Sequence, residues 1–372
     1  MEITVSRAEL LKELTMVQGV VERKTTIPIL SNLLFEVTGD SLNLTATDLD
    51  LSLRTQCKAK VKKDGACTIP ARKLFDYVKL LPDGELSLKL QENHWVQVKC
   101  GRSNTKMVGM ARANFPAVPA FPEGMDLKLP SAILKKMIAS TVFAISQEES
   151  RYTLNGALLV IKADSMTMVA TDGHRLAHIE NSAAKFQGVG GENKTLVPRK
   201  AMVELITLLN ETEEPFVHFA KDDSTLFFKV GSRLLTSRQL TGQFPPYEAV
   251  LPRENNKSVT VDSGQLSAAL QRVAQFSDVR SGAVRLKMEK DELRISASSQ
   301  DSGESEDSIE TKYSADPVTI GFNSIYLLDF LKASSTGNVM IEFKDSQSAG
   351  QMRPADAAEG YKYRYVVMPM RI

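Results

Sequence analysis

An internal repeat limits the fold of this 372-residue chain more than any other feature of its sequence. Each copy opens with apolar residues at helical spacing, behind a Ser or Asp that is able to cap free backbone N–H groups. The matching leucines are Leu10, Leu134 and Leu266, which are 124 and 132 residues apart. Helices are therefore expected over Ser6–Leu14, Pro130–Ile138 and Asp262–Leu270.

Further features follow these helices in the same order. A strand of alternating pattern ends at Asp48 and, 124 residues later, at Asp172, with a looser copy over Leu293–Ser299. A short strand then enters a second helix over Thr68–Leu81, Leu196–Leu209 and Thr319–Leu331. Such features, repeated in one order at similar spacing, are hard to explain by chance.

The repeat predicts the fold class and the domains. Each copy has two helices separated by several short alternating strands, which favours helices packed on one face of an antiparallel sheet. We predict an α+β protein of three repeated domains, a division that suits a chain too long for one core. The first two copies close on Phe-Pro, and proline- and glycine-rich stretches follow, so we place the domains at 1–125, 126–252 and 253–372.

Charge is balanced over the whole chain, with 46 Lys and Arg against 45 Asp and Glu, so the total gives no attraction to nucleic acid. An acidic run lies at Asp301–Asp307. For any single basic residue, a solvated helix face is the simpler interpretation. Together, the basic residues on or before the helices favour a positive surface for sequence-independent phosphate contact. They include Arg7, Lys12, Arg23, Lys24, Arg72, Lys73, Lys79, Lys135, Lys136, Arg199, Lys200 and Arg272.

Composition narrows the class of protein. Apolar and charged fractions of 42% and 24% are typical of a soluble globular protein, and no apolar run approaches the roughly 20 residues that span a bilayer. The three cysteines, Cys57, Cys67 and Cys100, form no CxxC pair. They favour reduced thiols in a cytoplasmic protein over a disulfide framework or a zinc site.

Patterns for catalysis and metal binding do not occur in a credible context. His174 and His178 have the spacing of a helical metal pair, but they lie on Met166–Ile179, which alternates as one strand and would hold them about 13 Å apart. Asp48 and Asp172 occupy equivalent places in two copies, where closing a strand-end turn explains them better than acid–base chemistry does. We expect no enzyme, no metal and no cofactor.

The chain resembles the bacterial DNA sliding clamp family, the beta subunit of DNA polymerase III, over essentially its whole length. The segments that carry the resemblance are Thr26–Leu34, Arg151–Gly156, Ala170–Ala177, Val197–Lys200 and Tyr365–Ile372. The resemblance implies the DNA clamp fold, in which two chains close head to tail into a ring whose helices line the hole. Such a homodimer is a processivity factor, and it keeps hold of double-stranded DNA by topology. Its partners are a clamp loader, the replicative DNA polymerase, and repair or translesion proteins with clamp-binding peptides.

The resemblance also implies three sets of site residues. For DNA binding it points to Lys24, Arg72, Tyr152, Arg199 and Arg253. For the partner-peptide cleft, between the second and third domains, it points to Leu154, Thr171, Gly173, His174, Arg175, Leu176, Pro245, Val250, Tyr326, Val366, Val367, Met368, Pro369 and Met370. For the dimer interface it points to Lys73, Arg102 and Met107 on the first domain, facing Phe276, Glu304, Glu306 and Asp307 on the third domain of the other chain.

The sequence departs from the family pattern at four cleft positions, Thr153, Ala249, Gln347 and Ala349, and segment 350–364 looks lengthened. A protein-interaction scaffold of the same fold that does not encircle DNA is the second hypothesis for function. An enzyme with an unrecognised site is the third.

Overall fold

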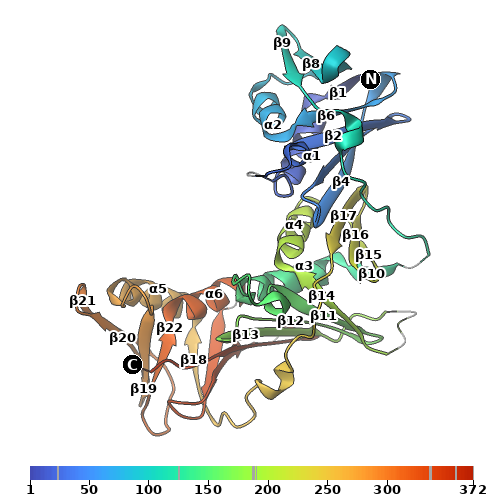
Figure 1. The fold of residues 1–372 in the computed structure, drawn as a ribbon. Coiled ribbons are helices and arrows are strands. Elements are labelled where there is room, and N and C mark those ends of the chain that lie inside the picture. The colour runs from blue at the N-terminus through green and yellow to red at the C-terminus, as the bar shows by residue number, and fades with distance from the viewer. Residues whose placement is uncertain are drawn as a thin grey trace. The chain divides into compact units, whose positions relative to one another are not determined.

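The computed structural model describes residues 1–22, 25–124, 126–186, 189, 191–334, 337–356 and 358–371, and Figure 1 shows its ribbon. These residues include six α-helices: α1 (Arg7–Val17), α2 (Ala71–Leu80), α3 (Ser131–Thr141), α4 (Arg199–Asn210), α5 (Ser263–Val273) and α6 (Ser324–Ser334). The repeat predicted all six helices. Every pairing between named strands is antiparallel, as the repeat also predicted.

The unit of repetition is smaller than the sequence suggested. A strand, a helix and three strands follow one another six times, twice in each repeat. In the first repeat the strands are β1 (Glu2–Ser6), β2 (Asn32–Thr38), β3 (Ser41–Thr47), β4 (Leu51–Lys58), an additional β5 (Lys60–Lys63), β6 (Ala66–Pro70), β7 (Glu85–Leu90), β8 (Trp95–Cys100) and β9 (Ser103–Val108).

The other two repeats follow the same order. The strands of the second are β10 (Leu127–Pro130), β11 (Gly156–Lys162), β12 (Ser165–Thr171), β13 (Arg175–Asn181), β14 (Asn193–Pro198), β15 (Phe216–Lys221), β16 (Thr225–Val230) and β17 (Arg233–Arg238). Those of the third are β18 (Lys257–Asp262), β19 (Ala283–Glu289), β20 (Glu292–Ser299), β21 (Gly303–Glu310), β22 (Val318–Asn323), β23 (Asn338–Phe343), β24 (Gly350–Pro354) and β25 (Tyr361–Val367).

The strand before each helix pairs with the other half of its own repeat, for example β1 with β7 and β6 with β2. In α1, α3, α4, α5 and α6, the first N–H of the helix then donates to the backbone carbonyl just before that partner strand, as Arg7 does to Gly84 at 2.9 Å. The side-chain cap predicted at Asp262 forms, because its carboxylate accepts from the Gln265 N–H at 2.8 Å. The cap predicted at Ser6 was wrong, since that hydroxyl makes no cap bond and the backbone bond to Gly84 closes the helix start instead.

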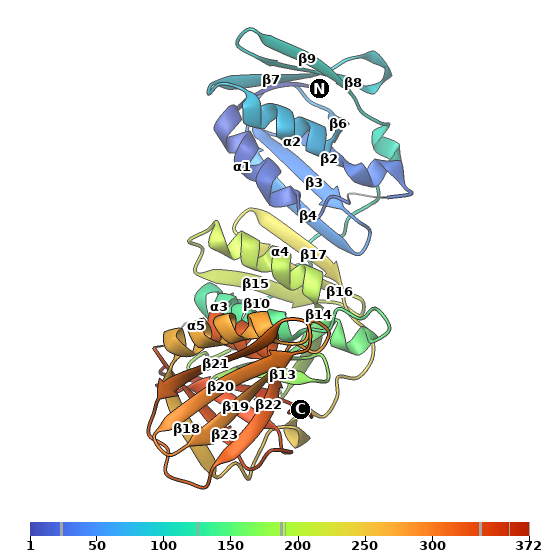
Figure 2. The same cartoon turned by 90° about the vertical axis from the view of Figure 1, so that its left-hand side faces the viewer.

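The chain divides into two compact units. The first comprises residues 1–132 and 200–239, and its sheets have the strand orders β5-β1-β7-β8-β9 and β10-β15-β16-β17-β4-β3-β2-β6. The larger sheet joins strands of two repeats where β17 pairs with β4. Figure 2 shows α1 and α2 of this unit side by side, and α1 packs on β3 and β4 through Leu10, Leu14 and Val17.

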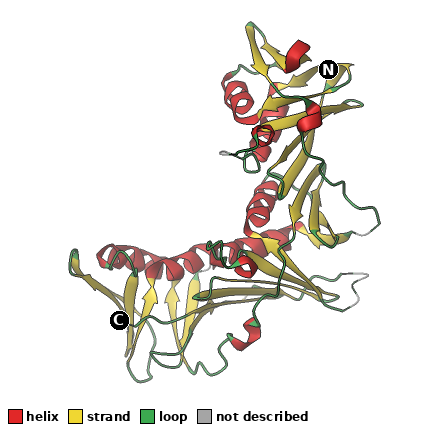
Figure 3. Cartoon of the chain, viewed as in Figure 1, coloured by secondary structure: helices red, strands yellow, loops and turns green. Residues whose placement is uncertain are grey.

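The second unit comprises residues 133–199 and 240–372, with sheets β14-β11-β12-β13-β25-β24-β23-β18 and β21-β20-β19-β22. Here the repeats join where β13 pairs with β25 over seven residues. In Figure 3 the helices α5 and α6 of this unit lie along one side of its strands. The strands of the second repeat are divided between the two units, so the two compact units do not correspond to the three repeats. The division into three domains therefore stays a prediction from the repeat.

Burial separates two leucines of α2 and gives a stability prediction. Leu74 is fully buried and Leu80 is 85% exposed. We expect Leu74→Ala to lower the free energy of unfolding by about 2–5 kcal/mol, because it leaves a cavity, and Leu80→Ala to change it by less than about 0.5 kcal/mol. Urea unfolding followed by circular dichroism measures both, and equal effects would contradict the packing of α2.

Candidate functional site

A cleft opens in the second unit over the strands β11, β12, β13 and β25. Its cavity has a volume of about 130 Å³. Tyr247 lines it and was not predicted; it lies in a 3-10 helix of one turn, Tyr247–Ala249, which is too short to show a periodicity. The other lining residues were all predicted from the resemblance: Leu154, Thr171, Gly173, His174, Arg175, Leu176, Pro245, Val250, Val366 and Met368.

Strand alternation gives the cleft its apolar floor. Leu176 on β13 pairs in register with Val366 on β25, and both belong to one buried apolar cluster. The next pair, Ala177 and Tyr365, points to the other side of the sheet, where the Tyr365 ring stacks on Phe330 of α6 at 5.1 Å. The cleft face and the helix face of this sheet therefore alternate residue by residue.

Four predicted cleft residues do not line this cavity: Tyr326, Val367, Pro369 and Met370. Val367 is buried, and by alternation it faces away from Val366. The Tyr326 ring lies 4.4 Å from the Arg175 guanidinium. The Met370 N–H donates to the Gly321 carbonyl at 2.8 Å, which holds the segment after β25 in place.

A tight turn shapes one edge of the cleft. The prediction of one strand over Met166–Ile179 was wrong, since β12 ends at Thr171 and β13 begins at Arg175. Asp172 closes the turn between them, because its Oδ1 accepts the N–H groups of His174 (3.0 Å) and Arg175 (3.1 Å). Asp48 closes the equivalent turn between β3 and β4 in the same way, as the repeat predicted.

Arg175 anchors the cleft floor to the helix layer. Its guanidinium donates to Asp172 at 3.0 Å, to Asp329 of α6 at 2.6 Å and to the Phe143 carbonyl at 2.7 Å. These bonds use three of the five N–H donors of the guanidinium, and they tie the cleft to α6 and to the segment after α3.

His178 lies under the cleft. It follows Leu176 on the same face of β13, and its ring lies 5.6 Å from the Tyr247 ring. Burial, together with the positive charges of Arg364 and Lys362, lowers the pKa of His178 to about 4. His178 is therefore neutral at physiological pH. The two histidines share no metal site, because His174 lies in the turn and His178 is buried in the strand.

The residues predicted to bind DNA lie on separate elements. Arg72 is exposed on α2 in the first unit. In the second unit, Arg199 begins α4, Tyr152 is 72% exposed in the short helix at 152–154, and Arg253 is exposed before β18. Lys24 lies outside the described residues.

Positive charge concentrates on the helices. The six α-helices carry eleven Lys and Arg against five Asp and Glu, whereas the rest of the chain carries 35 against 40. Two of the five helix carboxylates, Glu13 and Glu204, are buried. The helices are therefore net positive and the rest of the chain is net negative, as the sequence predicted. The near-neutral total charge does not reveal this difference.

Apart from Lys73, the predicted interface residues lie on or beside two strands at sheet edges, β9 and β21. Met107 is on β9, Arg102 directly precedes it, and Lys73 is exposed on α2. Glu304, Glu306 and Asp307 are on β21, and Phe276 lies in the short helix after α5. Asp307 bonds Arg272 of α5, and Glu306 bonds Arg294 at 3.2 Å, so part of this acidic charge already has partners within the chain.

Among the described residues, no group of three His, Cys, Asp or Glu side chains is placed to hold a metal ion. Within the same ranges, the helices are too short or too polar for a membrane span. The three cysteines are free and buried, and burial raises the pKa of the Cys57 and Cys67 thiols to about 12.

Comparison with known proteins covers the whole chain. Three family models match: the N-terminal domain of the DNA polymerase III beta subunit over residues 1–119, its central domain over 128–246 and its C-terminal domain over 248–371. The chain is 37% identical to the beta sliding clamp of Pseudomonas putida and 34% identical to that of Escherichia coli K12, with 100% of each chain covered.

Solved structures agree with these matches. The chain is 36% identical to the crystal structure of the DNA polymerase III subunit beta from Pseudomonas aeruginosa, with a TM-score of 0.92. It is also 36% identical to a sliding clamp from Bartonella birtlesii bound to griselimycin, with a TM-score of 0.94. Both comparisons cover 100% of each chain.

The buried His178 predicts a pH dependence of stability. Its pKa is about 4 when folded against 6.5 ordinarily, so between these values the unfolded chain binds more protons than the folded one. We expect stability to fall as pH is lowered from about 6.5 to about 4, by up to roughly 3 kcal/mol from this residue. Urea unfolding at neutral and acid pH should show a smaller loss for His178→Phe than for wild type. An equal loss would contradict this origin.

Proposed function

Because the chain belongs to the DNA polymerase III beta subunit family, whose curated members are named beta sliding clamps, we propose that it closes a homodimeric ring around double-stranded DNA. It is a sliding clamp and processivity factor, a non-catalytic accessory subunit of the polymerase. The observation that carries the ring is the pattern of paired and unpaired strands at the ends of the repeated motifs.

Each of the six motifs ends in a third strand, and four of these pair across repeats. β4, from the first half of repeat one, pairs with β17, from the second half of repeat two. β13, from the first half of repeat two, pairs with β25, from the second half of repeat three. The same rule leaves β21 and β9 at free sheet edges. We propose that β21 of one chain pairs with β9 of the next, a head-to-tail contact that closes into a ring when the rotation permits.

Charge supports this pairing. β21 carries four acidic residues, Glu304, Glu306, Asp307 and Glu310, whereas β9 carries Lys106 and follows Arg102. Opposite charges facing each other across paired strands are favourable, and like charges directly opposite are unfavourable. The edges are therefore complementary to each other, and a second β21 would be repelled.

The charged helices support the contact with DNA. Ten of their eleven basic residues are exposed, and cations without base-reading geometry contact phosphates at any sequence. We propose that Arg72, Tyr152, Arg199 and Arg253, with Lys24, meet the duplex in the ring. Retention then depends on closure of the ring, so contacts weak enough to slide are sufficient.

We propose that the cleft holds the clamp-binding peptides of the clamp loader, the replicative polymerase and repair or translesion proteins in the cytoplasm. Its apolar floor and adaptable Met368 suit aliphatic or aromatic anchors of several partners. The griselimycin complex of the Bartonella clamp agrees with a ligand site on this fold. Peptide binding in the cleft does not require a closed ring. The alternative function is therefore a protein-interaction scaffold that does not encircle DNA, and the next experiment distinguishes the two.

Loading on circular DNA tests the ring directly. We expect the labelled protein, placed by a clamp loader on nicked circular duplex, to stay through gel filtration and to be lost once the circle is linearised, because only free ends release a closed ring. Equal retention on circles and linear duplex would reject the ring and favour simple electrostatic binding.

Charge reversal tests the edge pairing. We expect Arg102→Glu to raise the dimer dissociation constant at least about tenfold, and the added Glu304→Arg to restore part of the loss, because the swapped pair attracts again. Sedimentation velocity over a dilution series measures both. Lys58→Glu on β4, an equal charge change away from β9, is the control. A double variant no better than the single one would contradict the contact.

A further inference from the structure

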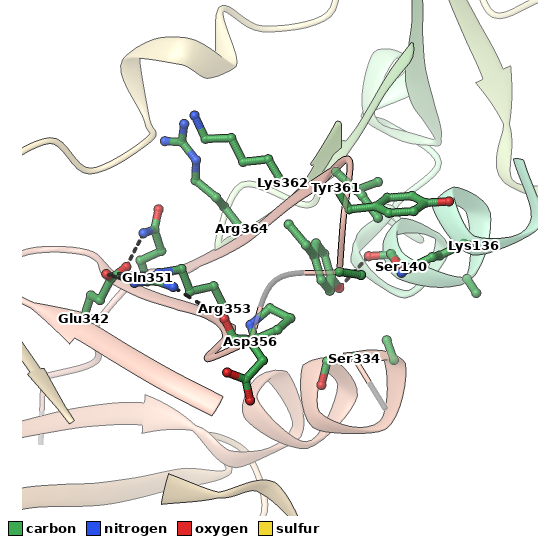
Figure 4. A pocket seen from close by; sticks show the side chains of 16 residues that line it. Lys136, Ser140, Ser334, Glu342, Gln351, Arg353, Asp356, Tyr361, Lys362 and Arg364 are labelled. Carbon is green, nitrogen blue, oxygen red and sulfur yellow. Dashed lines mark hydrogen bonds and ion pairs between the residues drawn. The ribbon is translucent and has the colours of Figure 1, made fainter. Parts of the chain in front are cut away.

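A second cavity lies beside the cleft, where the large sheet of the second unit splits. β24 pairs with β25 only over Gly350–Met352, while β25 continues along β13 as far as Tyr361. The gap between the diverging strands holds a cavity of about 640 Å³, which Figure 4 shows from close by. The sequence had marked this stretch, residues 350–364, only as a lengthened segment.

The two cavities meet along β25, although the larger one is also lined on the helix face of the sheet by α3, α6 and Tyr363, whose hydroxyl donates to the Ser140 carbonyl. Along β25, Val366 lines the cleft, and Arg364 and Lys362 line the larger cavity. Alternation puts these three side chains on the same face, and Figure 4 shows Lys362 and Arg364 extending to the same side. His178 pairs with Arg364 in register and contacts Tyr247 of the cleft, so the surface is continuous from one cavity to the other.

Arg364 is a cation without a counter-ion among the described residues. Its cross-strand neighbour is His178, which is neutral. The nearby carboxylates have other neighbours: Glu180 is opposite Lys362, and Glu248 bonds the Tyr247 side chain. The remaining acidic residues that line the cavity do not pair with Arg364 either.

Those groups are Glu342 and Asp356. Glu342 accepts from Arg353 at 3.1 Å and from Gln351. Asp356 points to the other side of the cavity, toward the helix that carries Ser334 (Figure 4). The fourth cation of the lining, Lys136, lies over the Tyr361 ring at 3.9 Å. The Arg364 guanidinium is therefore available to pair with an anion from outside the chain.

We infer that Arg364 is a specificity-determining residue beside the cleft, which favours partner peptides with an acidic side chain near their apolar anchor. The inference rests on the proposed function of the cleft. Two residues of extended strand separate Val366 from Arg364 by about 6.8 Å, so the guanidinium reaches peptide positions within about four residues of the anchor. Arg364 also lines the larger cavity, so there is free volume beside its guanidinium.

A double-mutant cycle between peptide and protein tests this contact. The probes are fluorescent synthetic peptides with a central Leu-Phe pair and either Asp or Asn at each of the four positions on either side. Wild type should bind at least one Asp peptide about threefold to tenfold more tightly than its Asn partner in fluorescence anisotropy. Arg364→Gln should abolish this preference and leave the Asn peptide unaffected. Lys290→Gln, in the turn between β19 and β20, removes an equal charge elsewhere and should keep the preference.

The outcomes separate the two proposals. If the peptides bind and Val250→Asp in the cleft abolishes binding, but Asp and Asn bind equally at every position, the inference about Arg364 is overturned while the cleft stands. A preference for Asp that survives in Arg364→Gln overturns it as well. If wild type binds none of the peptides, the cleft assignment fails, and the inference fails with it.

Discussion

Main-chain hydrogen bonding between the third strands of neighbouring repeats is the constraint on which this structure depends. A sheet edge presents unpaired N–H and C=O groups that must find partners or face solvent. In this chain β4 pairs with β17 and β13 with β25, so sheets of neighbouring repeats become one sheet at each junction. The repeated motif thus determines the fold of each half-repeat, and its third strand is the one that pairs with a neighbouring repeat. The free edges of β9 and β21 follow from the same rule.

Ion pairs with at least one largely buried partner also cross these junctions. In the first unit, Glu13 of α1 accepts from Arg233 of β17 at 2.7 and 3.0 Å, with both side chains largely buried. In the second, Arg175 ties β13 to Asp329 of α6. A buried ion pair adds little net stability over a well-packed apolar contact, but it strongly disfavours arrangements that leave one charge unpaired. Each pair therefore disfavours other alignments of the helix on the strand that it contacts.

The sequence predicted the repeated elements better than the contacts between them. Helices such as 71–80 have apolar residues at a clear helical spacing and follow a short strand, so they could be predicted from the sequence. The division of each repeat into two motifs was not, because the two halves share backbone order and little sequence. Ten cleft residues followed from the resemblance, whereas Tyr247 and the charged flank at Arg364 did not. Tyr247 lies in a 3-10 helix of one turn, and Arg364 lies where β25 diverges from β24. Local periodicity in the sequence encodes neither position.

If β9 and β21 are the two halves of one intermolecular junction, their backbone amides exchange hydrogen more slowly in the dimer than in the free chain. Hydrogen exchange measured by mass spectrometry over a dilution series of the protein detects this. We expect peptides from both strands to gain protection together as the chains associate, while those from the edge strands β6 and β18 stay unchanged. Protection of only one of the two strands, or of neither at concentrations where sedimentation shows dimers, would contradict this junction.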